Sequence, residues 1–160
     1  MISKSISPNQ TKKLAGLLAR EILRTKNLTK SALVLALSGD LGTGKTTFVQ
    51  GFLRALGIRR KITSPTFVLM KKFQVPKPKS QINYKLQNFK TIYHIDCYRI
   101  AKPDELLKFG LKEILNNPQN IVLIEWSEKI KKILPKNYIW LAFKHGEKEN
   151  IRRIRINSSL

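Results

Sequence analysis

The chain has 160 residues, of which 42% are hydrophobic, and its 31 Lys and Arg against 10 Asp and Glu give a formal net charge of +21. This length supports one hydrophobic core, so we expect a single domain over residues 1–160, with a positive field that attracts polyanions such as RNA, DNA or anionic lipid. No apolar run reaches the roughly 20 residues that span a bilayer, and the single cysteine, Cys97, excludes an internal disulfide, so we expect a soluble, cytoplasmic protein.

The first half of the chain predicts a helix, a buried strand and a second helix. Ser7 and Gln10 match a capping box that opens a helix reaching about residue 25. Residues 32–37 are continuously apolar, which is typical of a strand buried on both faces of a parallel sheet. A glycine-rich turn follows, and residues 46–56 predict the second helix.

The second half of the chain predicts more strands and shorter helices. In chain order, these are strands at 67–75 and 91–95, a helix at 103–115, a strand at 121–124, a short helix to about 133, and strands at 138–143 and 151–156. The polar stretch from Pro76 to Asn88 predicts an exposed, mobile loop. The last two strands alternate apolar and polar residues and predict an antiparallel hairpin at the sheet edge. This order favours a three-layer α/β nucleotide-binding domain, with a mostly parallel central sheet and antiparallel C-terminal strands.

The glycine-rich turn is the strongest chemical signal, because residues 39–46 match the P-loop pattern G-x-x-x-x-G-K-[ST]. The buried strand before it and the helix after it would aim backbone N–H groups and a helix N-terminus at phosphate oxygens. Lys45 would reach the β- and γ-phosphates, and the Thr46 hydroxyl would ligate Mg²⁺. The other expected cradle residues are Asp40, Leu41, Gly42, Thr43, Gly44 and Thr47. The alternative is an ordinary glycine turn.

Two predicted strands end in carboxylates. Glu125 follows the apolar residues 121–124, so we assign it as the Walker B carboxylate that holds Mg²⁺ directly or through water; a capping carboxylate is the alternative. Ligands of a parallel sheet bind at the carboxyl ends of its strands, so Asp96 could orient the attacking water or hold a metal-bound one. Thr66, in the segment Ser64-Pro65-Thr66, could lie near the γ-phosphate in a switch-like loop.

Other features limit the chemistry less sharply. A lone histidine near a strand end, such as His94, is more often structural, and Trp126 favours packing. The guanine-reading pattern [NT]-K-x-D does not follow a late strand, which favours ATP over GTP. The positive charge has two open interpretations: contact with nucleic acid, or a codon bias toward A and T, which also enriches Lys, Ile and Asn.

Several motifs in order resemble the TsaE (YjeE) family, the bacterial P-loop ATPases of tRNA threonylcarbamoyladenosine (t6A) synthesis. The matching segments are Asn9 to Ala19, Gly39 to Phe48, Thr63 to Phe67, His94 to Arg99, Asp104 to Leu106, Gly110-Leu111 and Ile124 to Glu128. The resemblance implies a protein that hydrolyses ATP with Mg²⁺, weakly alone and better with its partners TsaB and TsaD. It would thereby support threonylcarbamoyl transfer to adenosine 37 of tRNAs that read codons beginning with A.

The resemblance also implies roles for individual residues. Lys45 and Thr46 would carry phosphate and Mg²⁺, Glu125 would carry Mg²⁺, Asp96 and Thr66 would complete the hydrolytic site, and Thr11 would lie beside the base or ribose. In the segment His94 to Arg99, Cys97 stands where the family usually has leucine, and we interpret this difference as a neutral packing change. Members often place a late arginine near the nucleotide, and Arg152 and Arg153 are both candidates.

Two other classes of function remain as alternatives. The first is a small P-loop nucleotide kinase, although no lid-sized insertion rich in arginine is present in the sequence. The second is a basic RNA-binding module with a vestigial P-loop, and direct contact of the basic surface with tRNA stays open.

Overall fold

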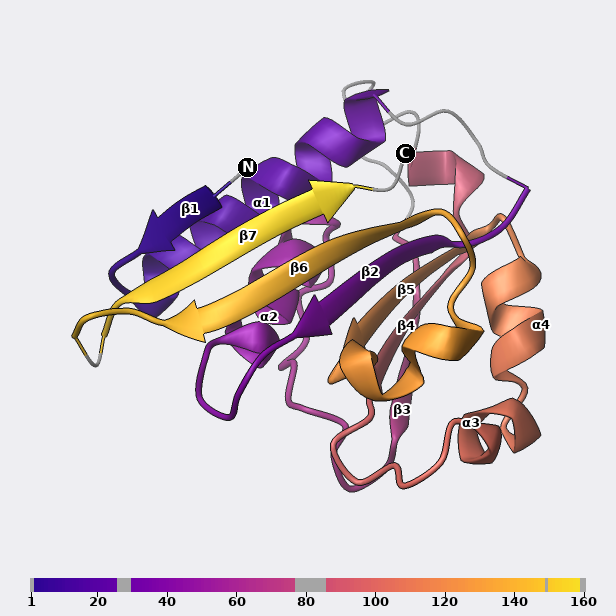
Figure 1. Cartoon of the computed structure of the whole chain (residues 1–160). Coiled ribbons are helices and arrows are strands. Elements are labelled where there is room, and N and C mark those ends of the chain that lie inside the picture. Colours follow the sequence, from indigo (N-terminus) through magenta and orange to yellow (C-terminus); the bar gives the residue numbers. More distant parts are fainter. Residues whose placement is uncertain (1, 26–29, 77–85, 149, 159–160) are drawn as a thin grey trace.

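The computed structural model describes residues 2–25, 30–76, 86–148 and 150–158. Its strands are β1 (Ile2–Ser5), β2 (Leu33–Ser38), β3 (Met70–Gln74), β4 (Thr91–Asp96), β5 (Asn120–Glu125), β6 (Tyr138–His145) and β7 (Arg152–Ser158). Its helices are α1 (Pro8–Thr25), α2 (Lys45–Ala55), α3 (Asp104–Lys108), α4 (Leu111–Asn116) and the 3₁₀ helix η2 (Ser127–Ile133). Within these ranges the strands form one seven-stranded sheet in the order β1-β7-β6-β2-β5-β4-β3 (Figure 1).

The centre of the sheet is parallel and its flanks are antiparallel. Strands β6, β2, β5 and β4 run parallel to their neighbours in this group. Strand β3 pairs antiparallel with β4 on one side, and β7 and β1 extend the other side antiparallel. This mixed arrangement confirms the predicted α/β fold with a parallel centre and antiparallel C-terminal strands.

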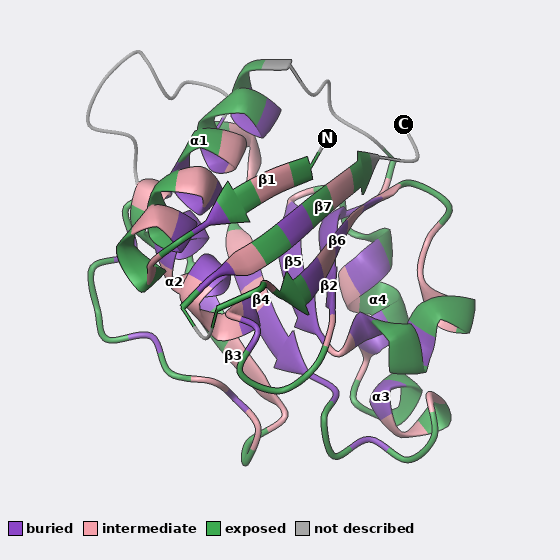
Figure 2. Cartoon of the chain, turned by 60° about the vertical axis from the view of Figure 1, so that its left-hand side comes forward, coloured by how far each residue is buried: buried purple, intermediate pink, exposed green. Residues whose placement is uncertain are grey.

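The buried strand β2 shows why the fold has three layers. All six of its residues are buried, and successive side chains of a strand point to opposite faces. Leu35 and Leu37 join the apolar cluster beneath α1 and α2, whereas Val34 joins the cluster beneath α3 and α4. Figure 2 shows the buried central strands lying between these two pairs of helices.

The start of α1 follows its sequence signal closely. Ser7 Oγ accepts the backbone N–H of Gln10 at 3.2 Å, which satisfies one of the free donors of the first turn. The Gln10 side chain accepts the backbone N–H of Ile6 at 2.7 Å, one residue before the donor of a standard capping box. This end of α1 is held in place beside the P-loop.

One strand was missed, and the bounds of two predicted elements were wrong. Strand β1 was not predicted, and it pairs with β7, so the C-terminal hairpin does not form the sheet edge. The strand predicted from residue 67 begins at Met70, because Leu69 has a φ of 63° and Phe67 is 82% exposed in the preceding turn. The helix predicted over residues 103–115 divides into α3 and α4 at Gly110, whose φ is 78°.

The loop predicted between Pro76 and Asn88 lies mostly outside the described residues, since residues 77–85 are not among them. The described residues at its C-terminal end were also expected to be exposed, and one of them is not. Leu86 is buried and belongs to the apolar cluster beneath α1 and α2, so this end of the segment packs against the core.

Candidate functional site

The P-loop joins the carboxyl end of β2 to the first turn of α2. Gly39 has a φ of 131°, and a Cβ at this position would lie 2.2 Å from the carbonyl oxygen of Phe143 on β6. Only glycine fits there without displacing the neighbouring strand. Gly42 and Gly44 also have positive φ angles, of 75° and 97°. The loop can therefore curl in a way that most side-chain-bearing residues resist, as the sequence motif predicted.

The remaining loop residues set its shape. The Thr43 side chain is buried, and its hydroxyl donates to the carbonyl of Asp40 at 2.7 Å. The side chains of Asp40 and Leu41 are exposed. From β6, His145 Nε2 lies 3.0 Å from the carbonyl of Leu41. The loop is therefore held both by its own side chains and by the neighbouring strand.

Lys45 folds back over the loop that precedes it. Its Nζ donates to the carbonyl oxygens of Gly39 at 2.5 Å and Asp40 at 2.8 Å, and it lies 3.9 Å from the centroid of the Trp126 ring. Burial lowers the pKa of Lys45, and the nearby carboxylate of Glu125 offsets part of that shift. Phosphate oxygens could replace the two carbonyls as partners of this ammonium group. Trp126, expected to serve packing, is also part of the site.

Glu125 ends β5 beside the first turn of α2. Its Oε2 accepts the Thr46 hydroxyl at 2.8 Å, and its Oε1 lies 2.8 Å from His94 Nε2. His94 is fully buried, and Glu125 is 2% exposed. This carboxylate therefore joins the P-loop helix to β4 through two short contacts.

The Thr46–Glu125 pair suits a magnesium ion. Two adjacent ligands of an octahedral Mg²⁺, each 2.0–2.1 Å from the metal, stand about 2.9 Å apart, close to the 2.8 Å between Thr46 Oγ1 and Glu125 Oε2. Mg²⁺ usually takes one or two protein oxygens and completes its shell with phosphate and water. Among the described residues, no group of three or more His, Cys, Asp or Glu side chains could hold a metal.

Asp96 ends β4 directly opposite Glu125 in the parallel register. Its Oδ2 accepts the hydroxyls of Ser64 at 2.6 Å and Thr66 at 2.5 Å, while its Oδ1 accepts the backbone N–H of Tyr98 at 2.9 Å. The structure thus brings Asp96, Thr66 and Glu125 to one edge of the sheet. The switch-like segment is tied to this edge through the Asp96 carboxylate.

Two adjoining cavities open over the P-loop. The first, of about 320 Å³, is lined by Leu41, Gly42, Gly44, Lys45, Thr46, Thr47, Ser64, Thr66, Asp96, Tyr98, Glu125 and Trp126. The second, of about 450 Å³, is lined by Ser7, Pro8, Thr11, Gly42, Gly44, Thr47, Asn150 and Arg152. Gly42, Gly44 and Thr47 line both cavities, which therefore adjoin each other. Lys45, Asp96 and Glu125 line the first cavity, whereas Arg152 is the one charged residue in the described lining of the second.

Of the two candidate arginines, Arg152 lines the second cavity and Arg153 does not. Arg152 Nε donates to the carbonyl of Gly42 at 3.1 Å, whereas Arg153 pairs with Glu147 on the exposed side of the hairpin. Thr11 also lines this cavity, but it is 2% exposed and its hydroxyl lies 2.8 Å from Ser5 Oγ. Thr11 thus lines the cavity next to the P-loop, and its hydroxyl already has Ser5 as a partner; its place beside a base or ribose stays a prediction.

The sequence favoured a structural role for His94 over contact with the site, and it assigned no site role to Trp126 or His145. One signal for His94 was available, because it lies two residues before Asp96 and strand side chains two apart share a face. The contacts of Trp126 and His145 depend on how η2 and β6 pack beside the loop, which the local sequence does not encode.

A strand, a glycine loop and a helix, with a buried lysine and two carboxylates on adjacent strand ends, define a protein of the P-loop class. A family model described as "Threonylcarbamoyl adenosine biosynthesis protein TsaE" matches residues 5–154. The chain therefore belongs to the TsaE family. Within the part of the chain that the structure describes, no helix is both long and apolar enough to cross a membrane.

Individual relatives agree with the family model. Proteins named "tRNA threonylcarbamoyladenosine biosynthesis protein TsaE" include one from Rickettsia conorii, 41% identical over 80% of this chain and 62% of its own length. The Bacillus subtilis protein of that name is 34% identical over 89% and 77%, and the Haemophilus influenzae one is 39% identical over 68% and 60%. The chain thus spans about three fifths of the Haemophilus and Rickettsia conorii proteins.

A solved structure shows the same fold. The crystal structure of Bacillus subtilis YdiB superimposes with a TM-score of 0.71 at 28% sequence identity, covering 100% of this chain and 86% of YdiB. The shared fold includes both flanks of the sheet, because the match covers the whole chain.

Proposed function

We propose that this chain is a cytoplasmic Mg²⁺-dependent ATPase that acts with TsaB and TsaD in t6A synthesis. The observation that carries the proposal is the grouping of Lys45, Thr46 and Glu125 within one cavity beside Asp96. The relatives, which are tRNA threonylcarbamoyladenosine biosynthesis proteins by name, suggest the pathway. In this proposal residues 1–160 work as one P-loop domain, and hydrolysis supports threonylcarbamoyl transfer to adenosine 37 of tRNAs that read ANN codons.

The P-loop binds the triphosphate. Backbone N–H groups from Gly42 to Thr47 face the phosphate oxygens, and the N-terminus of α2 adds positive potential. Lys45 exchanges its two carbonyl partners for β- and γ-phosphate oxygens. Because Lys45 is only 5% exposed, its charge acts on the phosphates with little screening by water.

The two strand-end carboxylates divide the remaining work. Thr46 and Glu125 would hold Mg²⁺, which when bound neutralises charge that develops on the phosphates. His94 fixes the orientation of the Glu125 carboxylate through its 2.8 Å contact. Asp96, with Thr66, orients the attacking water near the γ-phosphate. This division explains why both carboxylates lie on neighbouring parallel strands.

The second cavity takes the nucleoside. Thr11 and Arg152 line it from opposite ends of the chain, and ATP is the proposed nucleotide. Arg152 is the only arginine among the described residues that line the two cavities. A nucleotide kinase that closes over two phosphorylated substrates needs more such groups, so the ATPase is favoured over the kinase.

Isothermal titration with ATP and Mg²⁺, combined with ATP turnover in the presence of TsaB and TsaD, tests the proposal. Lys45→Ala should weaken ATP binding more than tenfold, while Lys144→Ala, an exposed lysine on β6, serves as the control. Glu125→Gln and Asp96→Asn should retain ATP binding and lose about 100-fold or more in turnover. Normal turnover by Glu125→Gln would contradict the metal assignment. Efficient phosphoryl transfer to a nucleoside monophosphate would overturn the accessory-ATPase proposal.

A further inference from the structure

A large basic groove lies apart from the nucleotide site, between α1, α2 and the segment that follows α2. It encloses about 1080 Å³ and is lined by Lys12, Lys13, Gly16, Leu17, Arg20, Gln50, Gly51, Arg54, Ala55, Arg59, Arg60, Lys61 and Ile62. All seven of its cationic side chains are exposed. Its described lining contains no acidic residue and no aromatic one.

The two helices form this groove because they cross very closely. A Cβ added at Gly51 would lie 2.5 Å from the Cα of Lys12, and one at Gly16 would lie 3.6 Å from the Cβ of Ala55. Small residues at the crossing let the backbones approach, so the basic faces of both helices flank one recess. The third wall is held by Gln50, whose Nε2 donates to the carbonyl of Ile62 at 3.0 Å.

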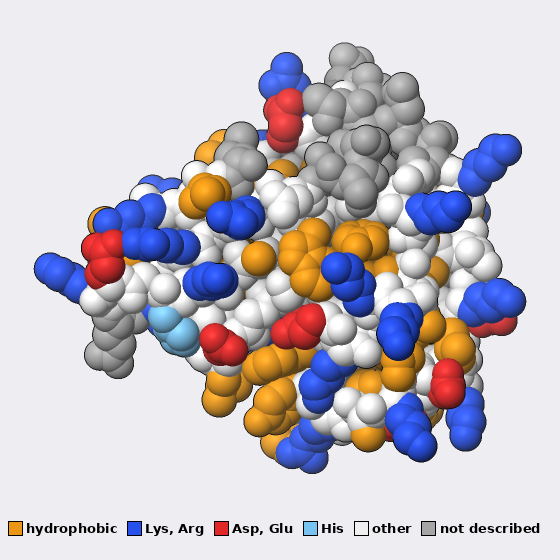
Figure 3. Space-filling view, in the orientation of Figure 1, with side chains coloured by type: hydrophobic (Ala, Val, Ile, Leu, Met, Phe, Trp, Pro, Cys, Tyr) orange, Lys and Arg blue, Asp and Glu red, His pale blue; other side chains and the backbone are white. Residues whose placement is uncertain are grey.

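The groove is richer in Lys and Arg than the chain as a whole. Figure 3 shows Lys and Arg scattered across the described part of one face of the molecule, so charge alone would not single out a site. Seven of the thirteen lining residues are Lys or Arg, whereas these types make up 31 of the 160 residues of the chain.

The kind of cation also matters. Four of the nine arginines in the sequence line this groove, although lysine predominates elsewhere. A codon bias toward A and T raises lysine and does not explain arginines gathered in one recess. The planar guanidinium group binds phosphate oxygens through two parallel N–H donors. The composition of the groove therefore fits phosphate recognition.

We infer that this groove binds the phosphate backbone of transfer RNA. From Lys12 to Arg20 the helix rises about 12 Å, a length that several successive phosphates of a nucleic-acid strand span. The described lining has no aromatic side chain on which bases could stack, so we expect the contacts to be mainly to the phosphate backbone and largely independent of sequence. A flat lipid surface cannot meet all the cations of a recess at once, which favours RNA over membrane.

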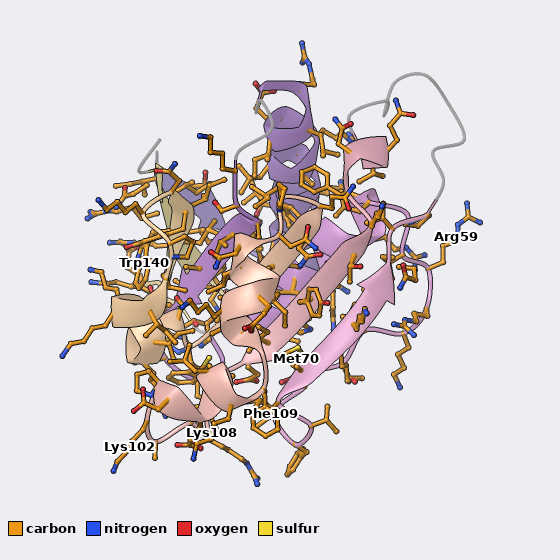
Figure 4. All side chains as sticks on the ribbon, turned by 90° about the vertical axis from the view of Figure 1, so that its right-hand side faces the viewer. Arg59, Met70, Lys102, Lys108, Phe109 and Trp140 are labelled. Carbon is orange, nitrogen blue, oxygen red and sulfur yellow. The ribbon has the colours of Figure 1, made fainter. Side chains whose placement is uncertain are left out.

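The choice of transfer RNA as the polyanion rests on the proposed function, whereas the groove itself does not. Arg20, Arg54 and Arg59 are exposed, so they can be replaced without disturbing the core, whereas Arg60 packs over the Phe73 ring. Arg20, Arg54 and Arg59 represent the three walls. Figure 4 shows Arg59 projecting away from the ribbon and well separated from Lys102 and Lys108, which supply a control on another face.

Fluorescence anisotropy with a labelled, unmodified tRNA transcript tests the inference across a range of salt concentrations. The triple variant Arg20→Gln/Arg54→Gln/Arg59→Gln should bind tRNA at least about tenfold more weakly at 0.1 M salt, and its log–log salt slope should fall by about 2 to 3. The matched variant Lys102→Gln/Lys108→Gln/Lys112→Gln, with the same net charge, should retain most of the affinity and slope. Replacing the three arginines with lysine should preserve the salt slope.

Three outcomes would overturn the inference. The first is an equal loss of tRNA affinity in the groove and control variants, and the second is full tRNA affinity in the groove variant. The third is that the protein binds phosphatidylglycerol vesicles or poly-glutamate more tightly than tRNA. Lys45→Ala keeps this result separate from the proposed function, because it should lose ATP binding and retain tRNA binding. Conversely, failure of tRNA binding with normal ATP turnover would leave the proposed ATPase intact.

Discussion

His94 and Glu125 form a buried pair that links the proposed metal site to β4. Their side chains are 0% and 3% exposed, and the contact is 2.8 Å long. His94→Leu removes the partner of one carboxylate oxygen at nearly constant volume. Leaving a buried group unsatisfied costs about 1–3 kcal/mol. However, His94 Nδ1 is itself buried without a hydrogen-bond partner among the described residues, and leucine removes that cost, so the expected net loss is about 1–2 kcal/mol.

The functional effect should be larger than the structural one. His94 orients Glu125, whose other oxygen meets Thr46, and loss of such a supporting contact typically costs 10- to 100-fold in metal affinity or activity. Urea unfolding gives the free energy of unfolding, and a Mg²⁺ titration of ATP turnover gives the half-saturating concentration. His94→Gln is the control, since its amide nitrogen can still donate to Glu125, although its amide oxygen, like Nδ1, adds a second buried polar atom. If the leucine and glutamine variants had equal Mg²⁺ dependence, the positioning role of His94 would be wrong.

Three further predictions concern other parts of the site. Gly39→Ala should lower the free energy of unfolding by more than about 3 kcal/mol. Gly44→Ala should lower it less, because a Cβ added at Gly44 meets nothing within 4 Å. Equal losses of the two variants in urea unfolding would refute the close approach at Gly39. Burial raises the pKa of the Cys97 thiol to about 12, so its stabilising contribution is full below the unfolded-state pKa of about 8.5 and falls as pH rises above it. The free energy of unfolding of the wild type, relative to Cys97→Ala, should therefore fall between about pH 8.5 and about pH 10. Arg152→Ala should raise the Kd for ATP several-fold in titration calorimetry, whereas Arg153→Ala should not.

Local patterns predicted the elements that carry the P-loop. The strand β2 and the helix α2 each have a continuous signal in the sequence, and the loop between them needs glycine at positions whose φ is positive. The positions of Asp96 and Glu125 followed from the rule that parallel strands end at one edge, and the register places them directly opposite each other.

Features that depend on packing between distant segments were not predictable. Strand β1 has only four residues, and it is ordered by pairing with β7 at the far end of the chain. The choice of Arg152 over Arg153 depends on the register of the β6–β7 hairpin beside the loop. The groove between α1 and α2 arises from a crossing at Gly51, whereas in sequence its cations look scattered.

The charged groups of the site already have protein partners, and this shapes how a nucleotide would bind. Lys45 uses two loop carbonyls, Thr46 donates to Glu125, and Asp96 accepts the hydroxyls of Ser64 and Thr66. A triphosphate with Mg²⁺ would compete for the same atoms, so binding exchanges hydrogen bonds and gains less than the new contacts alone suggest. The exchange at Asp96 would also release the hydroxyls of Ser64 and Thr66, while Lys71 still donates to the carbonyl oxygens of Thr63 and Ser64. ATP that left Ser64 and Thr66 on Asp96 would therefore occupy the phosphate cradle without freeing this carboxylate to act on water.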